Sequence, residues 1–387
     1  VMLKLVLSVL FLLQSVAPGT QAHAEPRLIV RVASFNAYLN RPNAGQLAAE
    51  LADADDALEG DGSDRQVQAI AEIIQRVRPD LILLNEFDFD AGGLALERFQ
   101  QNFLGVSQNQ QQPIVYPHTF QAPSNTGIDS GLDLDGDGKL GGPGDAFGFG
   151  AFPGQYGMVL LSKYPIVSSQ IRTFQKFLWR DMPGALLPDN LETPESSDFY
   201  TPEQLETFRL SSKSHWDVPV QVGSSTLHVL AAHPTPPVFD GPEDRNGTRN
   251  HDEIRLWADY VGPAKAAEYL TDDRGHAGGL GLKRFVVVGD YNADPADGDS
   301  RQRAIDQLLN HPALNATWIP ASDGAAEDAK SEGMSNATHT GSARFDTADL
   351  NPNGPGNLRI DYVLPSRFGL MPVDGLSLIH ISEPTRH

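Results

Sequence analysis

Short apolar segments of strand length recur along the chain, and several of them end directly on a polar residue. Residues 81–84 are wholly apolar and are followed by Asn85 and Glu86, while residues 283–288 lead into Asp290. Apolar runs of this length, bounded by turn residues, are typical of strands that are buried on both faces. A fold with several buried strands and polar strand ends is therefore the first expectation.

The remaining segments define the fold class. Further predicted strands are 28–35, 158–161, 218–222, 226–232 and 358–364, and predicted helices are 64–78, 250–261 and 301–309. The strands 218–222 and 226–232 are separated by only three residues, which predicts a hairpin. We therefore expect an α/β fold in which two mixed or antiparallel sheets form a sandwich flanked by helices. Residues 100–152 show no hydrophobic period long enough for a core element, and residues 173–209 are a second irregular stretch, so both are predicted to be loop insertions.

The first 24 residues have the pattern of a secretory leader. A basic residue and a short apolar run precede Ala22-His23-Ala24, and small residues at these two alanine positions predict cleavage after Ala24. The apolar run is too short to span a membrane. We expect a secreted or periplasmic protein with no membrane anchor after cleavage and a catalytic domain over residues 25–375. The chain contains no cysteine, so its core must hold the fold without disulfides.

The charge balance bears on the substrate. Asp and Glu number 50 against 29 Lys and Arg, which gives a formal net charge of -21. Proteins that bind duplex nucleic acid without sequence preference use Lys and Arg to displace condensed counterions. The acidic composition therefore weighs against a protein that binds duplex nucleic acid through surface cations, although it does not exclude one, and we expect a monomer.

Five predicted strand ends carry polar residues of complementary chemistry. They are Asn36, Glu86, His233, Asp290 with Asn292, and Asp361. Carboxylates are hard oxygen ligands for Mg2+, amides position phosphate or metal, and imidazole transfers protons near neutral pH. For Asp290 and Asn292 alone, a simple turn after a strand would explain the same residues. Together the five strand ends predict one active site on a rigid sheet.

Six motifs in order resemble the endonuclease/exonuclease/phosphatase superfamily, whose members have a DNase I-like fold. The motifs are Ser34-Phe35-Asn36, Pro79-Asp80-Leu81 through Asn85-Glu86, Gly157-Met158-Val159-Leu160-Leu161-Ser162-Lys163-Tyr164-Pro165-Ile166, Ala232-His233, Gly289-Asp290-Tyr291-Asn292-Ala293 and Arg359-Ile360-Asp361-Tyr362. Each motif alone is weak, but all six in family order are specific. The resemblance covers the chain from about residue 28 to residue 365.

The resemblance implies a role for each matching residue. Glu86 resembles the principal ligand of Mg2+ or Mn2+, with Asn36 and Asp290 beside it. Asp290 also resembles the carboxylate that orients or deprotonates the attacking water, and Asn292 the amide that holds the scissile phosphate. His233 resembles the imidazole that protonates the leaving group or binds a phosphate oxygen.

The sequence departs from the family pattern in two places. The family has Gln where this chain has Asn85, a conservative change. Asp361 resembles the carboxylate that orients a second histidine, but the Ser-Asp-His segment that supplies it does not follow here. Residues 376–386 instead read as the translation of a sequencing-library adapter, so we expect 376–387 to be an artefact that packs on nothing and the chain to be impaired as an enzyme. His380 and His387 are accordingly not candidates for the missing base.

An aspartate-rich loop offers a second cation site. Asp133, Asp135 and Asp137 have the alternate spacing of a calcium loop, which places successive carboxylates around one ion. The twelfth position is Gly144 instead of a bidentate Glu, although Asp145 follows it. A calcium site and a solvated loop without metal both fit this pattern.

Two polar clusters flank the strand that leads to His233. They are Lys213, His215 and Trp216, and residues 244–251. They would either bind the second half of a substrate or simply solvate loop surfaces and cap helices. The favoured function is metal-dependent hydrolysis of a phosphoester. A secreted nuclease is the second hypothesis, and a calcium-bound extracellular binding module is the non-enzymatic one.

Overall fold

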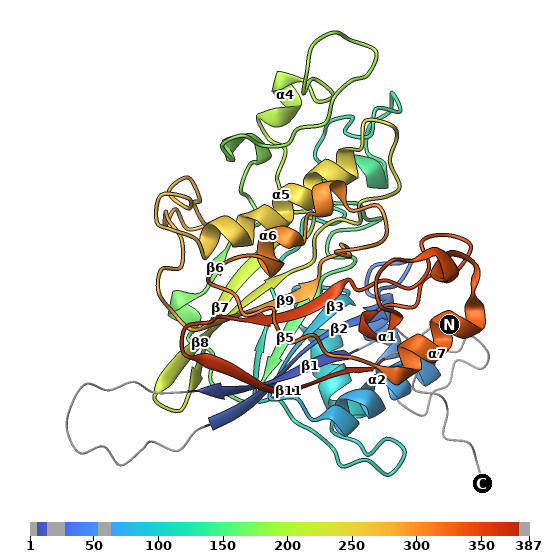
Figure 1. The fold of residues 1–387 in the computed structure, drawn as a ribbon, viewed down its shortest axis with the longest axis vertical. Coiled ribbons are helices and arrows are strands. Elements are labelled where there is room, and N and C mark those ends of the chain that lie inside the picture. The colour runs from blue at the N-terminus through green and yellow to red at the C-terminus, as the bar shows by residue number, and fades with distance from the viewer. Residues whose placement is uncertain (1–5, 14–27, 53–62, 379–387) are drawn as a thin grey trace, which may run out of the picture.

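The computed structural model describes residues 6–13, 28–52 and 63–378, which form two β-sheets packed face to face with helices on their outer sides (Figure 1). The first sheet has the order β11 (Leu370–Leu378), β1 (Val6–Leu13), β2 (Leu28–Leu39), β3 (Leu81–Phe87), β5 (Met158–Ser162) and β4 (His118–Phe120). The second has the order β10 (Asp361–Pro365), β9 (Phe285–Asp290), β8 (Ser225–Ala232), β7 (His215–Val222) and β6 (Arg172–Thr173). In each sheet one strand pair is parallel, β2 with β3 and β8 with β9, and the other pairs are antiparallel. The predicted mixed-sheet sandwich is therefore confirmed.

Alternating side chains of both sheets form the inner core. Val32, Leu83, Val229, Val288 and Val363 all belong to one fully or almost fully buried cluster between the sheets. Burial of each such aliphatic side chain contributes about 1.5–3 kcal/mol. Because the strands are buried on both faces, their sequences are continuous apolar runs instead of alternating ones.

The outer faces of the sheets are covered by helices. The α-helices are α1 (Gln46–Glu50), α2 (Ser63–Val77), α3 (Leu94–Arg98), α4 (Pro202–Leu205), α5 (Arg245–Tyr260), α6 (Asp306–Leu309) and α7 (Asp323–Glu332). Helix α2 packs on the first sheet through Ile70 and Ile74, and α5 packs on the second through Ile254 and Trp257. The prediction of a helix at 64–78 is confirmed by α2.

Two helix predictions differ from the structure at their boundaries. Helix α5 begins five residues before the predicted start, directly after Asp244, whose φ of 54° lies in the left-handed region and cannot continue a helix. The predicted helix 301–309 is interrupted, because Gln302 and Arg303 have φ values of 50° and 52°. Only α6 remains of it as an α-helix.

The prediction that residues 100–152 contain no core element is wrong, and residues 173–209 also contribute to the core. Residues 100–152 supply β4, which extends the first sheet beside β5, and Phe103, which is fully buried under α2. Residues 173–209 are largely irregular, but Phe174 and Trp179 are fully buried in the cluster beneath α5. Isolated aromatic residues can supply core area from irregular backbone, and they leave no period in the sequence.

The first and last described strands lie side by side in the first sheet. Strand β1, within the predicted leader, pairs antiparallel with β2 on one side and with β11 on the other. The expectation that residues 376–387 pack on nothing is wrong for 376–378, which continue β11 and pair with β1. Residues 379–387, with His380 and His387, lie outside the described residues. Among the described residues, no helix is both long and apolar enough to cross a membrane.

Candidate active site

The predicted site residues lie where the inner core between the sheets ends. In β9, Val286 and Val288 face the opposite sheet, so the two-residue period of a strand turns Asp290 the same way. In β10, Val363 faces the inner core, and the same period places Asp361 there as well. The apolar core thus changes into a polar layer at one rim of the sandwich.

A glycine brings two of the strands unusually close at this rim. A Cβ on Gly289 would lie 1.9 Å from the carbonyl oxygen of Ala232, so no other residue fits there without moving the backbone. Since Ala231 pairs with Val288, the parallel register places His233 level with Asp290. His233 Nε2 lies 3.8 Å from Asp290 Oδ2, and both side chains are almost fully buried.

The other sheet contributes an amide and a second carboxylate. Asn36 pairs with Asn85 in the parallel register of β2 and β3, and Glu86 follows with a φ of 58°, a left-handed conformation that costs energy for a residue with a Cβ. The Asn36 amide donates hydrogen bonds to Glu86 Oε1 at 2.8 Å and to Asp290 Oδ2 at 2.9 Å. Asn40 donates to the other oxygen of Glu86 at 2.8 Å.

These residues have the composition and spacing of a divalent-cation site. One ligand atom each from Glu86, His233 and Asp290 lie within 4.8 Å of one another. Ligands at about 2.1 Å from one ion are roughly 3 to 4 Å apart, so this cluster needs little adjustment to share an ion. Two carboxylates beside an amide favour a hard cation such as Mg2+ or Mn2+.

Two further predicted residues occupy the edge of this cluster. The backbone amide of Asn292 donates to Asp290 Oδ1 at 3.0 Å, and its side-chain amide donates to the carbonyl oxygen of Pro234 at 3.0 Å. Asp361 is opposite Asp290 in the antiparallel pair of β9 and β10, and its backbone amide donates to Thr347 Oγ1 at 2.9 Å. Asn292 therefore fixes the orientation of the Asp290 carboxylate.

A buried carboxylate supports the segments on both sides of His233. Glu253 of α5 accepts hydrogen bonds from the amide of Ser212 at 2.6 Å, from its hydroxyl at 3.0 Å and from the amide of Thr235 at 2.7 Å. Burial raises the pKa of Glu253, while these hydrogen bonds and the cations of Arg249 and Lys213 act against that rise. Glu253 thus ties the start of β7 to the segment that follows His233.

His215 is a buried structural residue and not part of a solvated cluster. Its Nε2 donates to the carbonyl oxygen of Glu253 at 2.8 Å, so Nδ1 accepts from the Ser211 hydroxyl at 2.6 Å. Trp216 beside it is also almost fully buried. The idea that His215 and Trp216 solvate a loop surface is therefore wrong.

The titration of His215 makes folding stability depend on pH. Burial lowers the pKa of His215 from 6.5 to about 4. Between these two pH values the unfolded chain binds a proton at this residue and the folded chain does not. Stability from this residue is present above pH 6.5 and is lost as the pH falls toward 4, by about 3 kcal/mol. We expect urea unfolding at pH 7 and pH 4 to show a smaller loss in His215→Gln than in the wild-type chain. Equal losses in both proteins would contradict this assignment.

The carboxylates of the aspartate loop lie close together, and they also accept hydrogen bonds from the loop's own backbone. Oxygens of Asp133, Asp135 and Asp137 lie within 4.8 Å of one another. Each of the three carboxylates accepts at least one backbone N–H from the loop, and Asp137 also pairs with Lys139. A Cβ at Gly144 would lie 2.0 Å from Asp135 Oδ2, so any side chain at the twelfth position would require the Asp135 carboxylate to move.

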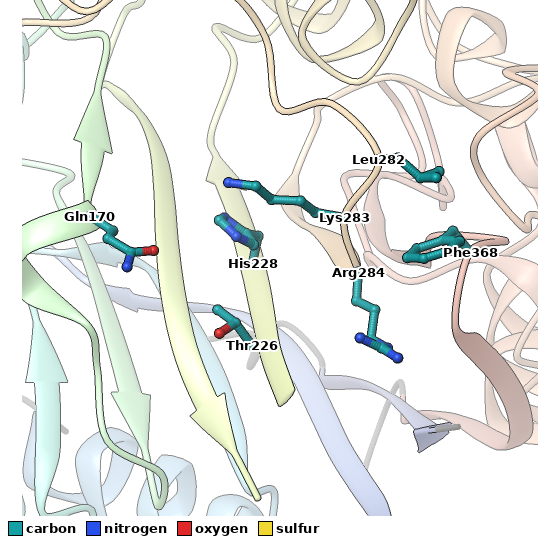
Figure 2. Close-up of a pocket in the computed structure, with 7 residues that line it drawn as sticks. All are labelled: Gln170, Thr226, His228, Leu282, Lys283, Arg284 and Phe368. Carbon is teal, nitrogen blue, oxygen red and sulfur yellow. The ribbon is translucent and has the colours of Figure 1, made fainter. Parts of the chain in front are cut away.

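A cavity of about 240 Å³ lies far from Glu86, His233 and Asp290, at the opposite end of the second sheet. Figure 2 shows the side chains that line it, among them Lys283 and His228. His228 lies in the half of β8 that is remote from His233, and Arg284 precedes β9. The cavity is therefore separate from the polar rim that carries Asp290.

Some residues of the site carried no sequence signal. Asn40 and Thr347 stand in loops of ordinary composition, and their roles depend on distant partners, Glu86 and Asp361. Glu253 is one of many polar residues of α5, and only tertiary structure shows that it is buried. The strand-end pattern could identify only residues that belong to strands.

Comparison with known proteins identifies the class. Residues 33–387 match the model of the Endonuclease/Exonuclease/phosphatase family, so the chain belongs to this family. No curated protein matches the sequence.

Solved structures are similar at low sequence identity. An endonuclease/exonuclease/phosphatase protein from Beutenbergia cavernae is 19% identical, with 87% of this chain and 64% of that chain covered and a TM-score of 0.44. Sphingomyelinase C from Streptomyces griseocarneus is 16% identical, with coverage of 87% and 84% and a TM-score of 0.40. A β-hairpin deletion mutant of the Staphylococcus aureus beta toxin is 14% identical, with coverage of 92% and 93% and a TM-score of 0.43. This chain spans less than two thirds of the Beutenbergia protein.

Proposed function

We propose that this chain is an exported phosphoesterase that uses Mg2+ or Mn2+ to hydrolyse a phosphomonoester or phosphodiester by in-line attack of water. The observation that carries the proposal is the meeting of Glu86, His233 and Asp290 within 4.8 Å at one rim, with the Asn36 amide bonded to both carboxylates. A phosphate ester is anionic and repels nucleophiles, so its hydrolysis needs charge neutralisation and a positioned water.

The residues divide these tasks. Glu86 and Asp290 would hold the cation, with Asn36 beside them, and the bound ion would neutralise charge on the phosphoryl oxygens. Asp290, whose carboxylate is oriented by the Asn292 amide, orients the attacking water and accepts its proton. His233 donates a proton or a hydrogen bond to the leaving group.

We further infer that residues 1–24 direct export and that a small phosphoester is preferred over nucleic acid. The leader-like sequence supports the first inference, and the net charge of -21 supports the second. The nuclease remains the second candidate because His233 follows its strand at the position found in the nuclease branch of the family. Neither candidate requires more than one copy of the chain.

Salt dependence separates these two substrates. We expect DNA binding at constant Mg2+ to have a shallow dependence on salt, with a log–log slope of about 2 or less in magnitude. The reason is that an acidic surface offers few cations to displace counterions from the DNA. A steep slope, measured by fluorescence anisotropy across a KCl series, would favour the nuclease.

A substrate panel tests the proposed function directly. The wild-type chain would be assayed on DNA, RNA, nucleotides, inositol phosphates and phospholipids, with Mg2+, with Mn2+ and with EDTA. Metal-dependent release of phosphate or alcohol from one class supports the proposal and names the substrate. Absence of hydrolysis from every class, in a protein that binds Mg2+ and at enzyme concentrations that would reveal an activity reduced about ten-thousandfold, would refute it.

The aspartate loop is a second candidate cation site. Its compact carboxylates support Ca2+, whereas the hydrogen bonds that they already accept support a loop that is stable without it. Adding Ca2+ to the panel separates an ion that stabilises the protein from one that supports hydrolysis. A rise in melting temperature that brings no gain in activity and that Asp135→Asn abolishes would assign Ca2+ to the loop.

A further inference from the structure

Lys213 is a buried cation whose ammonium has no ionic or hydrogen-bonded partner among the residues that the structure describes. Four Lys or Arg side chains are buried among the described residues. Arg41 pairs with Glu50, Arg249 donates to the Leu210 carbonyl oxygen at 2.8 Å, and the Arg359 guanidinium lies 4.8 Å from the centre of the Tyr362 ring. Lys213 is 7% exposed, and within the described part of the chain its ammonium forms no such contact.

The backbone places this ammonium at the catalytic rim. His215 pairs with Ala232 in the antiparallel register of β7 and β8, and continuing that register by two residues puts Lys213 level with Pro234, one residue beyond His233. The carbonyl oxygen of Lys213 accepts from the Asn125 amide at 2.8 Å. The preceding residue is held by Glu253, so the position of Lys213 is fixed from both sides.

The charges around Lys213 are those of Glu253 and Arg249 in α5 and of the two carboxylates of the candidate metal cluster. Burial lowers the pKa of Lys213, and the carboxylates of Glu253, Glu86 and Asp290 counteract this effect. Burying an ammonium costs several kcal/mol unless its charge is compensated. A lysine retained at this rim without a bonded partner therefore needs another reason for its presence.

We propose that Lys213 binds a non-bridging oxygen of the substrate phosphoryl group and stabilises the negative charge that remains when the cation is bound. A divalent cation balances the two charges of Glu86 and Asp290, which leaves the charge of the phosphate itself uncompensated. An ammonium that is already desolvated and fixed in place needs no reorganisation to meet it. This inference rests on the proposed function.

The competing explanation is that Lys213 only balances Glu253. The two charges interact, but no ion pair joins them within the described residues. The single variant Lys213→Met keeps most of the apolar stem and removes the charge. The double variant Lys213→Met with Glu253→Gln removes both buried charges, so it keeps the test valid if the single variant folds poorly.

The experiment measures binding of inorganic phosphate to the Mg2+-loaded protein by titration calorimetry, with melting temperature as a second readout. We expect phosphate affinity to fall at least about tenfold in Lys213→Met and to stay low in the double variant, even where the double variant regains stability. Hydrolysis of a chromogenic phosphodiester should fall about a hundredfold. Mg2+ affinity should be unchanged or higher, because a neighbouring cation is removed. Lys265→Met, an exposed lysine of the same charge, is the matched control.

Several outcomes would overturn the assignment. Wild-type phosphate affinity in Lys213→Met, or its return in the double variant, would make Lys213 the counter-charge of Glu253. A wild-type chain that binds Mg2+ but not phosphate would also overturn it. A wild-type chain that binds phosphate through Lys213 but hydrolyses no ester would refute the proposed function alone.

Discussion

Replacing Glu86 with Gln is expected to reduce hydrolysis by about a thousandfold and to weaken Mg2+ binding. A neutral amide is a poor ligand for a hard dication, and a catalytic metal supplies several kcal/mol, with each 1.36 kcal/mol equal to a factor of ten in rate. Steady-state kinetics across a Mg2+ titration would measure both effects. Glu97→Gln, on the exposed face of α3, is the matched control. Full wild-type activity in EDTA would refute the metal site.

Replacing His233 with Gln is expected to lower kcat by about a hundredfold to ten-thousandfold, the usual contribution of a positioned proton donor. Because the protonated imidazole acts as the acid, wild-type activity should fall toward alkaline pH. The alkaline limb of the pH–rate profile should flatten in the variant. His276→Gln is the control, since the His276 side chain is 68% exposed. An unchanged profile with reduced kcat would assign His233 a structural role instead.

The strand ends that carry the site could be predicted because they follow from local chemistry. Apolar runs buried on both faces end where the sandwich ends, and the first polar residue after each run must lie at a rim. Asp290 and His233 meet there for that reason, and Asn36 and Glu86 arrive from the other sheet. Their catalytic roles stay a prediction that only the variants can test.

The parts that could not be predicted depend on tertiary contacts. Trp179 is fully buried in a segment with no period, because it packs under α5 and donates to Asp252 at 2.7 Å. The predicted helix 301–309 breaks at Gln302 because its backbone is left-handed, and a glutamine does not predict that conformation. Lys213 stands among serines in the sequence, and only the fold shows that its ammonium is buried beside carboxylates from three other elements.

The origin of the ligands in different sheets has a thermodynamic consequence. Glu86 lies near the end of β3 in the first sheet, whereas Asp290 is the last residue of β9 in the second. An ion bound by both carboxylates would act as a removable cross-link between the two halves of the sandwich, and its binding free energy would oppose their separation. Linkage is reciprocal, so loosening the apolar contacts between the sheets, for example at Val288, would weaken metal binding although Val288 supplies no ligand. A measurement of metal affinity would therefore report how tightly the two sheets are packed together.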